Sequence, residues 1–361
     1  MWKQYSDNGK LTVDLELTTQ CNLKCPQCSR TDEKNKLKPY PFLALTSVTL
    51  DQFKSWFSPE DLCYVKYMHF SGTYGDPGMC KDLLPIVEYI INNSETNVGI
   101  NTNGTMRGED FWWDIGSIGK ERLRVIFDID GINQDMHSTY RRGSDLEKVL
   151  QAMEAVSMTP AKVTVLTVLF KHNQDYLDQI QDMAQSRAFK QIDFDYVEGN
   201  QFQNSNVYKF QDEDGNQQQL EQVTRKDREQ GLKRFDRRVR DHRHVDIATN
   251  YDSIECLSLK NKNIKVTAGG QVSPCCYLST PIERAIKGNL IASTHITSSG
   301  NHGDDMNPLI QNFVDNWKSF NLNHSNFSDV LDNQWFKDLK KSWSGAESVP
   351  YACAKVCGKC L

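Results

Sequence analysis

The sequence predicts an α/β fold in which a parallel sheet is followed by a smaller cysteine-rich region. Strand-like and helix-like segments alternate from residue 10 to about residue 199, and six such units in series favour parallel strands joined by helices. After residue 254 this alternation stops, and a hairpin pattern and a terminal group of cysteines follow. We therefore expect a core at 1–199, a polar and charged insertion or linker at 200–250, and a cysteine-rich domain at 251–361.

The predicted strands are short segments rich in apolar and β-branched residues. The first, Leu11–Leu17, alternates apolar and polar residues, which is the two-residue period of a strand. The six candidates are 11–18, 64–70, 97–102, 122–130, 161–170 and 191–198. Between them, apolar residues spaced three and four apart predict helices packed on the sheet, beginning near Leu83, Leu146 and Tyr176.

The insertion breaks this rhythm. Gln201–Gln219 is rich in Asn, Gln and Asp and has no apolar periodicity, and 225–243 carries many charges of both signs with basic patches. This composition favours a solvated helix or a mobile insertion. The alternative is a basic docking surface for an acidic peptide or a nucleic acid.

The cysteine-rich region begins with a predicted hairpin. Ile264–Ala268 and Gln271–Ser273 are strand-like, and Gly269–Gly270 between them predicts a primed turn. Three cysteines belong to no motif, and we expect them to be buried small residues: Cys63, Cys80 and Cys276.

The composition limits the possible partners and compartment. A net charge of −5 gives no general attraction to nucleic acid or anionic membranes, and no apolar run is long enough to span a bilayer. The N-terminus lacks the apolar stretch of a signal peptide. Eleven cysteines without an export signal indicate metal or cluster ligation rather than disulfides. We expect a cytoplasmic protein without a membrane or nucleic-acid partner.

Three cysteines, Cys21, Cys25 and Cys28, follow the first predicted strand. Thiolates hold iron–sulfur clusters, and a cubane normally takes four of them. Three ligands from one compact loop leave one iron open to bind a cofactor or substrate. The alternative is a zinc site, but zinc takes four ligands, usually in two close pairs, and the next cysteine is Cys63.

This loop resembles the cluster motif of the radical S-adenosylmethionine (SAM) enzymes, and the resemblance extends over roughly residues 10–361. It implies a partial (β/α)6 TIM-like barrel and a [4Fe–4S] cluster held by three cysteines and SAM. An external reductant such as flavodoxin or ferredoxin would supply the electron that cleaves SAM. The resulting 5′-deoxyadenosyl radical would then take a hydrogen atom from the substrate.

Four further segments resemble the SAM-binding motifs of that family. The run 70–77 is similar to its glycine-rich loop, which implies that Gly72, Gly75 and Asp76 hold the SAM ammonium, with Asp76 in place of the usual Glu. Asn103 matches a Thr-Asn-Gly motif. Asp128 stands at a position where a serine often contacts the SAM carboxylate; an aspartate would repel that group unless it is protonated or turned away, and contact with the ribose or the substrate is the alternative. Arg141 matches an arginine that reaches the same carboxylate, and Arg142 is the alternate.

The C-terminal cysteines resemble the extension called SPASM, or its shortened twitch form. The resemblance implies one auxiliary [4Fe–4S] cluster ligated by Cys256, Cys275 and two of Cys353, Cys357 and Cys360. A structural zinc in the same pocket is the alternative.

The function predicted from this resemblance is hydrogen abstraction from a substrate, with a peptide or protein side chain as the first hypothesis. Oxidation of a carbohydrate or another small molecule is the second hypothesis. A non-catalytic iron–sulfur or zinc protein that carries electrons is the alternative outside the enzymes.

Overall fold

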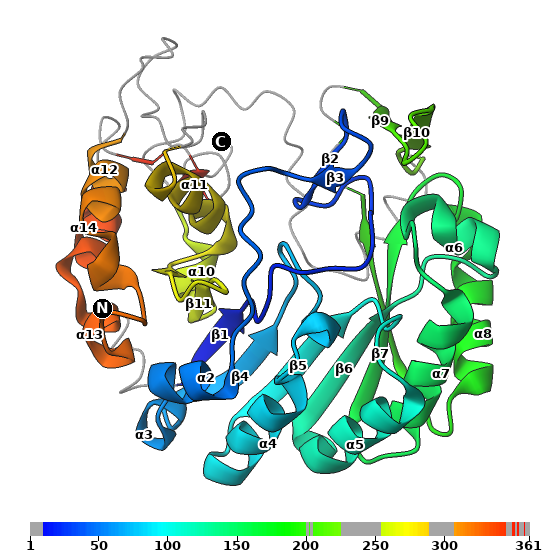
Figure 1. The fold of residues 1–361 in the computed structure, drawn as a ribbon, viewed down its shortest axis with the longest axis horizontal. Helices are drawn as coiled ribbons and strands as arrows, with labels where there is room; N and C mark the ends of the chain where they lie inside the picture. Colours follow the sequence, from blue (N-terminus) through cyan, green and yellow to red (C-terminus); the bar gives the residue numbers. More distant parts are fainter. Residues whose placement is uncertain are drawn as a thin grey trace.

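The computed structural model describes residues 10–199, 202, 205–224, 254–288, 307–343, 349–350, 352–353 and 357. Its centre is an eight-stranded sheet in the order β12-β11-β1-β4-β5-β6-β7-β8 (Figure 1). All neighbouring pairs from β11 to β8 are parallel, and β12 is antiparallel to β11. The predicted α/β fold with a parallel sheet is confirmed, and its form is that of a partial TIM barrel.

The predicted core strands all form. The bounds of the sheet strands are Leu11–Leu15 (β1), Val65–Phe70 (β4), Asn97–Thr102 (β5), Leu123–Asp128 (β6), Lys162–Leu169 (β7), Asp193–Glu198 (β8), Asn263–Val266 (β11) and Val272–Ser273 (β12). The last two belong to the predicted hairpin. Its first strand pairs with β1, so the cysteine-rich region extends the sheet of the core.

Helices cover one face of this sheet and continue beyond its β1 side (Figure 1). Their bounds are Leu50–Trp56 (α2), Pro59–Leu62 (α3), Leu83–Asn93 (α4), Glu109–Gly119 (α5), Gln134–Tyr140 (α6), Leu146–Ser157 (α7), Leu177–Arg187 (α8), Leu257–Lys260 (α10), Cys276–Ile286 (α11), Pro308–Asp315 (α12), Phe327–Asp332 (α13) and Gln334–Ser342 (α14). The stripe predicted from Leu83 is buried in α4, and that from Leu146 is buried in α7. None of the helices in the described part of the chain is both long and apolar enough to cross a membrane.

The two faces of the sheet differ in polarity. In β1, Leu11, Val13 and Leu15 are buried in the apolar core, whereas Thr12 and Asp14 remain partly exposed. β6 shows the same alternation. Because successive side chains of a strand point to opposite faces, the helices cover the apolar face and the other face carries polar groups. We call this second face the inner face.

Two small hairpins lie at the carboxyl ends of the sheet strands (Figure 1). One pairs Thr31–Asp32 (β2) with Lys38–Pro39 (β3), and the other pairs Val207–Gln211 (β9) with Gln217–Glu221 (β10). The second hairpin falls in the polar segment for which we expected a solvated helix or a mobile insertion. Its Phe210 and Leu220 are buried, and two apolar residues were too few to give a periodic signal. The basic segment 225–243 lies outside the described residues.

The turn between β11 and β12 is not the predicted primed turn. A primed turn needs a left-handed residue at its first central position, whereas here only Gly270 of the two glycines has a positive φ, +81°. The Gly270 N–H donates to the Thr267 carbonyl over 2.9 Å, so the turn starts earlier than predicted. A Cβ on Gly270 would lie 2.9 Å from the Trp56 ring.

Replacing Gly270 by Ala should therefore destabilise the protein by about 1–2 kcal/mol, the cost of forcing a side chain into the left-handed region. Gly269→Ala is the matched control, because its Cβ would meet no atom closer than 3.8 Å and Gly269 has no positive φ. Urea denaturation followed by circular dichroism would measure both. Equal losses in the two variants would contradict this account of the turn.

Candidate functional site

The three-cysteine loop follows the carboxyl end of β1, as predicted. Cys25 is buried, and Cys21 and Cys28 pack beside it in a small apolar cluster with Tyr140 and Phe170. Two backbone N–H groups point at the sulfurs: Leu23 donates to Cys21 Sγ over 3.4 Å, and Arg30 donates to Cys28 Sγ over 3.5 Å. Such donors stabilise thiolates, which are the ligands of an iron–sulfur cluster.

Contacts from three other parts of the chain fix the loop. Lys24 N–H donates to the Arg142 carbonyl over 3.0 Å. The Tyr208 hydroxyl in β9 donates to the Pro26 carbonyl over 2.8 Å. The Thr31 hydroxyl donates to the Cys25 carbonyl over 2.7 Å. Tyr208 could not be found from the sequence, because its segment carries no recognisable motif.

The glycine-rich loop after β4 packs directly on the backbone that leads into the cysteine loop. A Cβ on Gly75 would lie 2.0 Å from the Thr18 carbonyl oxygen, and one on Gly72 would lie 1.7 Å from the Gly75 carbonyl oxygen. The Asp76 N–H donates to the Gln20 carbonyl over 2.8 Å. Gly75 is therefore required for the close approach of the two loops, and Gly72 is required for the tight turn within the glycine-rich loop.

The buried Asp76 carboxylate joins this loop to the end of β5. It accepts hydrogen bonds from the Thr102 hydroxyl and the Gly78 N–H, each over 2.8 Å, and from the Asn103 N–H over 2.7 Å. Burial raises the pKa of Asp76, and these hydrogen bonds oppose the rise. In this arrangement Asp76 positions Asn103, whose side-chain amide lies 3.8 Å from Cys21 Sγ. Contact of Asp76 with the SAM ammonium stays a prediction.

Arg141 lies at the end of α6 between two carboxylates, with only 12% of its side chain exposed. It contacts Asp128 over 3.0 Å and Asp130 over 2.6 Å. Burial raises the pKa of Asp128 to about 7, while Arg141 acts to lower it. The same guanidinium lowers the pKa of the Cys25 thiol against the larger effect of burial. The sequence comparison identified Asp128 and Arg141 separately; the structure pairs them and adds Asp130. Arg142 instead pairs with Glu213 of the β9–β10 hairpin over 2.8 Å.

His137 resembles a histidine of the radical SAM family. It contacts the backbone of Asp130 and so supports the group formed by Arg141, Asp128 and Asp130. Burial lowers its pKa to about 4, so the ring is neutral at pH 7. Its Nδ1 accepts from the Asp130 N–H over 3.1 Å, which places the ring proton on Nε2, where it is donated to Ser144 Oγ over 2.9 Å. Ser144 Oγ in turn lies 2.9 Å from the hydroxyl of Thr105. The network connects β6 to the loop that holds Asn103.

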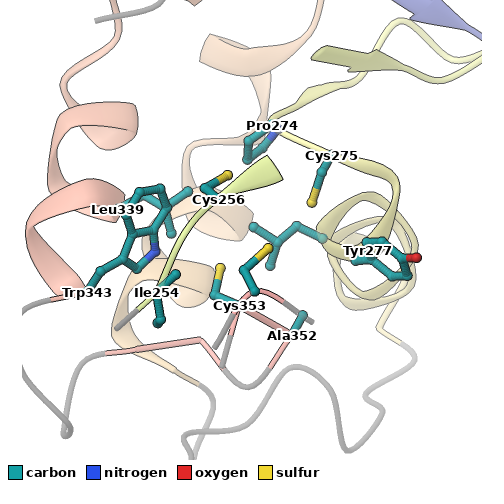
Figure 2. Close-up of a pocket in the computed structure, with 11 residues that line it drawn as sticks. Ile254, Cys256, Pro274, Cys275, Tyr277, Leu339, Trp343, Ala352 and Cys353 are labelled. Atoms are coloured by element: carbon teal, nitrogen blue, oxygen red, sulfur yellow. The ribbon is translucent and has the colours of Figure 1, made fainter. Parts of the chain in front are cut away.

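The C-terminal cysteines gather around a second, mainly apolar pocket. Cys256, Cys275, Cys353 and Cys357 line it, and Figure 2 shows the sulfurs of the three that it labels turned toward the same space. The neighbouring thiol of Cys357 raises the pKa of Cys256, and burial adds to the rise. Trp343 lines the same pocket, and among the described residues its buried indole N–H has no partner within hydrogen-bond geometry. The same side chain lowers the pKa of the Cys353 thiol against the larger effect of burial. Cys360 lies outside the described residues.

The other cysteines only partly match the expectation. Cys80 is buried, as predicted, but Cys63 and Cys276 are exposed, so the expectation was wrong for these two. Cys63 ends the short surface helix α3, and Cys276 is the first residue of α11. Within the described ranges, no three Cys, His, Asp or Glu side chains are arranged to hold a single metal ion.

Replacing Arg141 by Ala should destabilise the protein by about 3–5 kcal/mol, because the buried Asp130 and the largely buried Asp128 would lose their partner. Arg142→Ala is the matched control; its ion pair with Glu213 is more exposed, and we expect a loss of about 1 kcal/mol or less. Thermal and urea unfolding of the two variants would check this order. An Arg141→Ala protein as stable as the Arg142→Ala protein would contradict it.

Comparisons with known proteins agree with this geometry. The family model for the radical SAM superfamily matches residues 15–184. A probable GTP 3′,8-cyclase of Methanococcus vannielii is 29% identical over 191 residues, which are 50% of this chain and 59% of that protein. The molybdenum cofactor biosynthesis protein moc-5 of Caenorhabditis elegans is 26% identical over 204 residues, 55% of this chain and 32% of that protein. The match thus spans less than two thirds of either relative.

A solved structure shares the fold. SuiB of Streptococcus suis, in a structure bound to S-adenosylmethionine, has a TM-score of 0.50 and 12% identity, with 89% of this chain and 77% of that chain covered. At this identity the likeness concerns the fold alone. The family model matches just under half of the chain, and the matched segment includes the three-cysteine loop at the carboxyl edge of the partial barrel.

Proposed function

We propose that this chain reductively cleaves SAM and uses the 5′-deoxyadenosyl radical to take a hydrogen atom from a substrate. The observation that carries the proposal is the loop of Cys21, Cys25 and Cys28 at the carboxyl end of β1, in a barrel of the radical SAM superfamily. The match to the radical SAM family model and the similarity to GTP 3′,8-cyclases favour an enzyme over the electron-carrier alternative. An external reductant such as flavodoxin or ferredoxin would supply the electron.

The residues of the loop suit a cluster with an open iron. The three thiols would hold it, and the N–H groups of Leu23 and Arg30 would stabilise its thiolates. When bound, a [4Fe–4S] cluster passes one electron to SAM, whose C–S bond breaks. Backbone groups of the glycine loop at Gly72 and Gly75, together with Asp76, Asn103, Asp128 and Arg141, are proposed to form the surrounding SAM site.

The arrangement of Arg141 suggests how it serves this site. Its charge is shared with Asp128 and Asp130, and it also acts on the thiol of Cys25. We propose that Arg141 stabilises the anionic cluster ligands and orients Asp128. Direct pairing with the SAM carboxylate would require Arg141 to release one of these two carboxylates.

The substrate is less well supported. A peptide or protein side chain stays our first hypothesis, and a carbohydrate or other small molecule stays the alternative. The inner face carries partly exposed polar residues such as Asp14, which fits a polar substrate of either kind. The matches to GTP 3′,8-cyclases cover about half of this chain, so the substrate in their name does not carry over by itself.

We also propose that Cys256, Cys275, Cys353 and Cys357 hold an auxiliary [4Fe–4S] cluster of the SPASM or twitch kind. Four thiols around one pocket and the buried indole N–H of Trp343, which would donate to a cluster sulfur, support this assignment. A cluster is larger than one ion, so its ligands stand further apart than those of zinc. A fourth protein ligand would leave no open iron there.

Anaerobically reconstituted protein with a strong reductant should convert SAM to methionine and 5′-deoxyadenosine. Cys25→Ala should abolish this conversion, because two thiolates would not retain the cluster. Cys63→Ala is the matched control, since that thiol is exposed and belongs to no site. Liquid chromatography of 5′-deoxyadenosine measures the outcome. Unchanged formation by the Cys25→Ala protein would overturn the proposed function.

The auxiliary cluster has its own test. A protein with Cys21, Cys25 and Cys28 all replaced by Ala should keep about four irons and four sulfides per chain, the content of one [4Fe–4S] centre. Adding Cys275→Ala should remove them, whereas adding Cys63→Ala should not. Zinc without iron in the triple variant would refute the cluster and support a structural zinc site.

A further inference from the structure

A charged group of side chains on the inner face belongs to neither thiol site. Lys265 of β11 lies 3.4 Å from Asp14 of β1 and donates to Ser71 Oγ over 3.0 Å. His69 of β4 lies with Nδ1 3.9 Å from Asp14 Oδ1 and with Nε2 2.8 Å from Asn101 Oδ1 in β5. Lys265 is 2% exposed, an unusual position for a lysine that only solvates a surface.

The group lies between the two candidate sites. Asp14 is in register with His69 on one side and with Lys265 on the other. Asn101 lies two residues before Asn103, and the side-chain amide of Asn103 approaches Cys21 Sγ. Since a strand rises about 3.3 Å per residue, this group lies roughly 7 Å along the strands from the level of Asn103. On the other side, both Asp14 and Lys265 act on the thiol of Cys276, the neighbour of Cys275.

In the arrangement of His69, two hydrogen-bond acceptors face each other: its own Nδ1 and the carboxylate of Asp14. Asn101 Oδ1 can only accept, so Nε2 carries a proton, and in the Nε2–H tautomer Nδ1 is an acceptor that faces the Asp14 carboxylate. At 3.9 Å the two atoms are too far apart for a hydrogen bond. The side chains of His69 and Asp14 are 27% and 30% exposed, so the space beside them is open. A hydrogen-bond donor entering there would satisfy Nδ1.

The charges favour a neutral donor. The charges of Lys265 and Asp14 offset each other. Glu16, the residue after the end of β1, accepts from the Tyr74 N–H. Burial raises its pKa to about 7, so it adds only part of a negative charge at neutral pH. A phosphate or an ammonium would meet no unbalanced partner. A hydroxyl is neutral, can donate to His69 Nδ1, and can accept from the Lys265 ammonium.

We propose that His69, Asp14 and Lys265 bind a hydroxyl group of the substrate on the inner face, with His69 Nδ1 accepting its hydrogen bond. This proposal rests on the proposed function and specifies the substrate class of that site. Asn101 fixes the tautomer of His69, and Lys265 comes from β11, outside the segment that matches the family model.

The test follows deuterium from carbon into 5′-deoxyadenosine by mass spectrometry, since the radical carries away one hydrogen atom from the substrate. The probes are perdeuterated glucose, perdeuterated glycerol, and a serine-containing peptide deuterated at the serine β-carbon. Perdeuterated alanine, which lacks a hydroxyl, is the negative probe. We expect transfer from a hydroxyl-bearing probe and none from alanine; the sugar and peptide arms distinguish a small polyol from a peptide hydroxyl.

Variants test the residues. His69→Ala and the milder Asp14→Asn should each lower deuterium transfer roughly tenfold or more, the loss expected when one hydrogen bond of about 1.5 kcal/mol is removed. Thr12→Ala, on the same face of β1 and one side chain further from the cysteine loop, should transfer deuterium like the unaltered protein. Iron content and thermal unfolding confirm that each variant is folded and loaded.

The outcomes separate the two proposals. If the unaltered protein forms no 5′-deoxyadenosine, the proposed function fails. If it forms 5′-deoxyadenosine without deuterium from any hydroxyl probe, or if folded His69→Ala and Asp14→Asn transfer deuterium at the normal rate, the hydroxyl site is refuted and the proposed function stands.

Discussion

The arrangement of the site depends on the ion pairs that Arg141 forms with Asp128 and Asp130. The guanidinium of Arg141 bridges Asp128 and Asp130 at the end of β6, so the C-terminal end of α6 is held against the sheet. The next residue continues the connection, since the Arg142 carbonyl accepts from Lys24 in the cysteine loop. One ion triad therefore holds a strand, a helix end and the three-cysteine loop together. Two buried carboxylates without this arginine would carry a large desolvation cost.

The order of the core strands could be predicted because periodicity is a local signal. Leu11, Val13 and Leu15 alternate with polar residues, and the stripe from Leu83 has helical spacing. The cysteine loop could also be predicted, because its three ligands lie within eight residues of sequence. In both cases neighbouring residues carry the information, so no knowledge of distant contacts was needed.

The contacts that define the site could not be predicted, because they join residues far apart in the chain. Tyr208 reaches Pro26 from a hairpin whose two buried residues give no periodic pattern. Asp76 was identified as a ligand for SAM, but its oxygens are shared among protein donors, and that sharing depends on where β5 ends. The primed turn was inferred from a glycine pair, whereas only Gly270 has a positive φ, and it packs closely against Trp56 and Asn323, which are distant in the sequence.

Strand β11 gives the C-terminal region a second role besides carrying cysteines, because it forms part of the central sheet. By pairing with β1 it places Lys265 on the inner face opposite Asp14, and it leads directly to the turn before Cys275. Lys265 and Cys275 both lie outside the segment 15–184 that the superfamily model matches. The proposed hydroxyl site thus combines His69, from the matched segment, with Asp14 and Lys265, which lie outside it. Relatives that share the matched segment need not share the residues outside it, which is why similarity to the GTP 3′,8-cyclases does not determine the substrate of this chain.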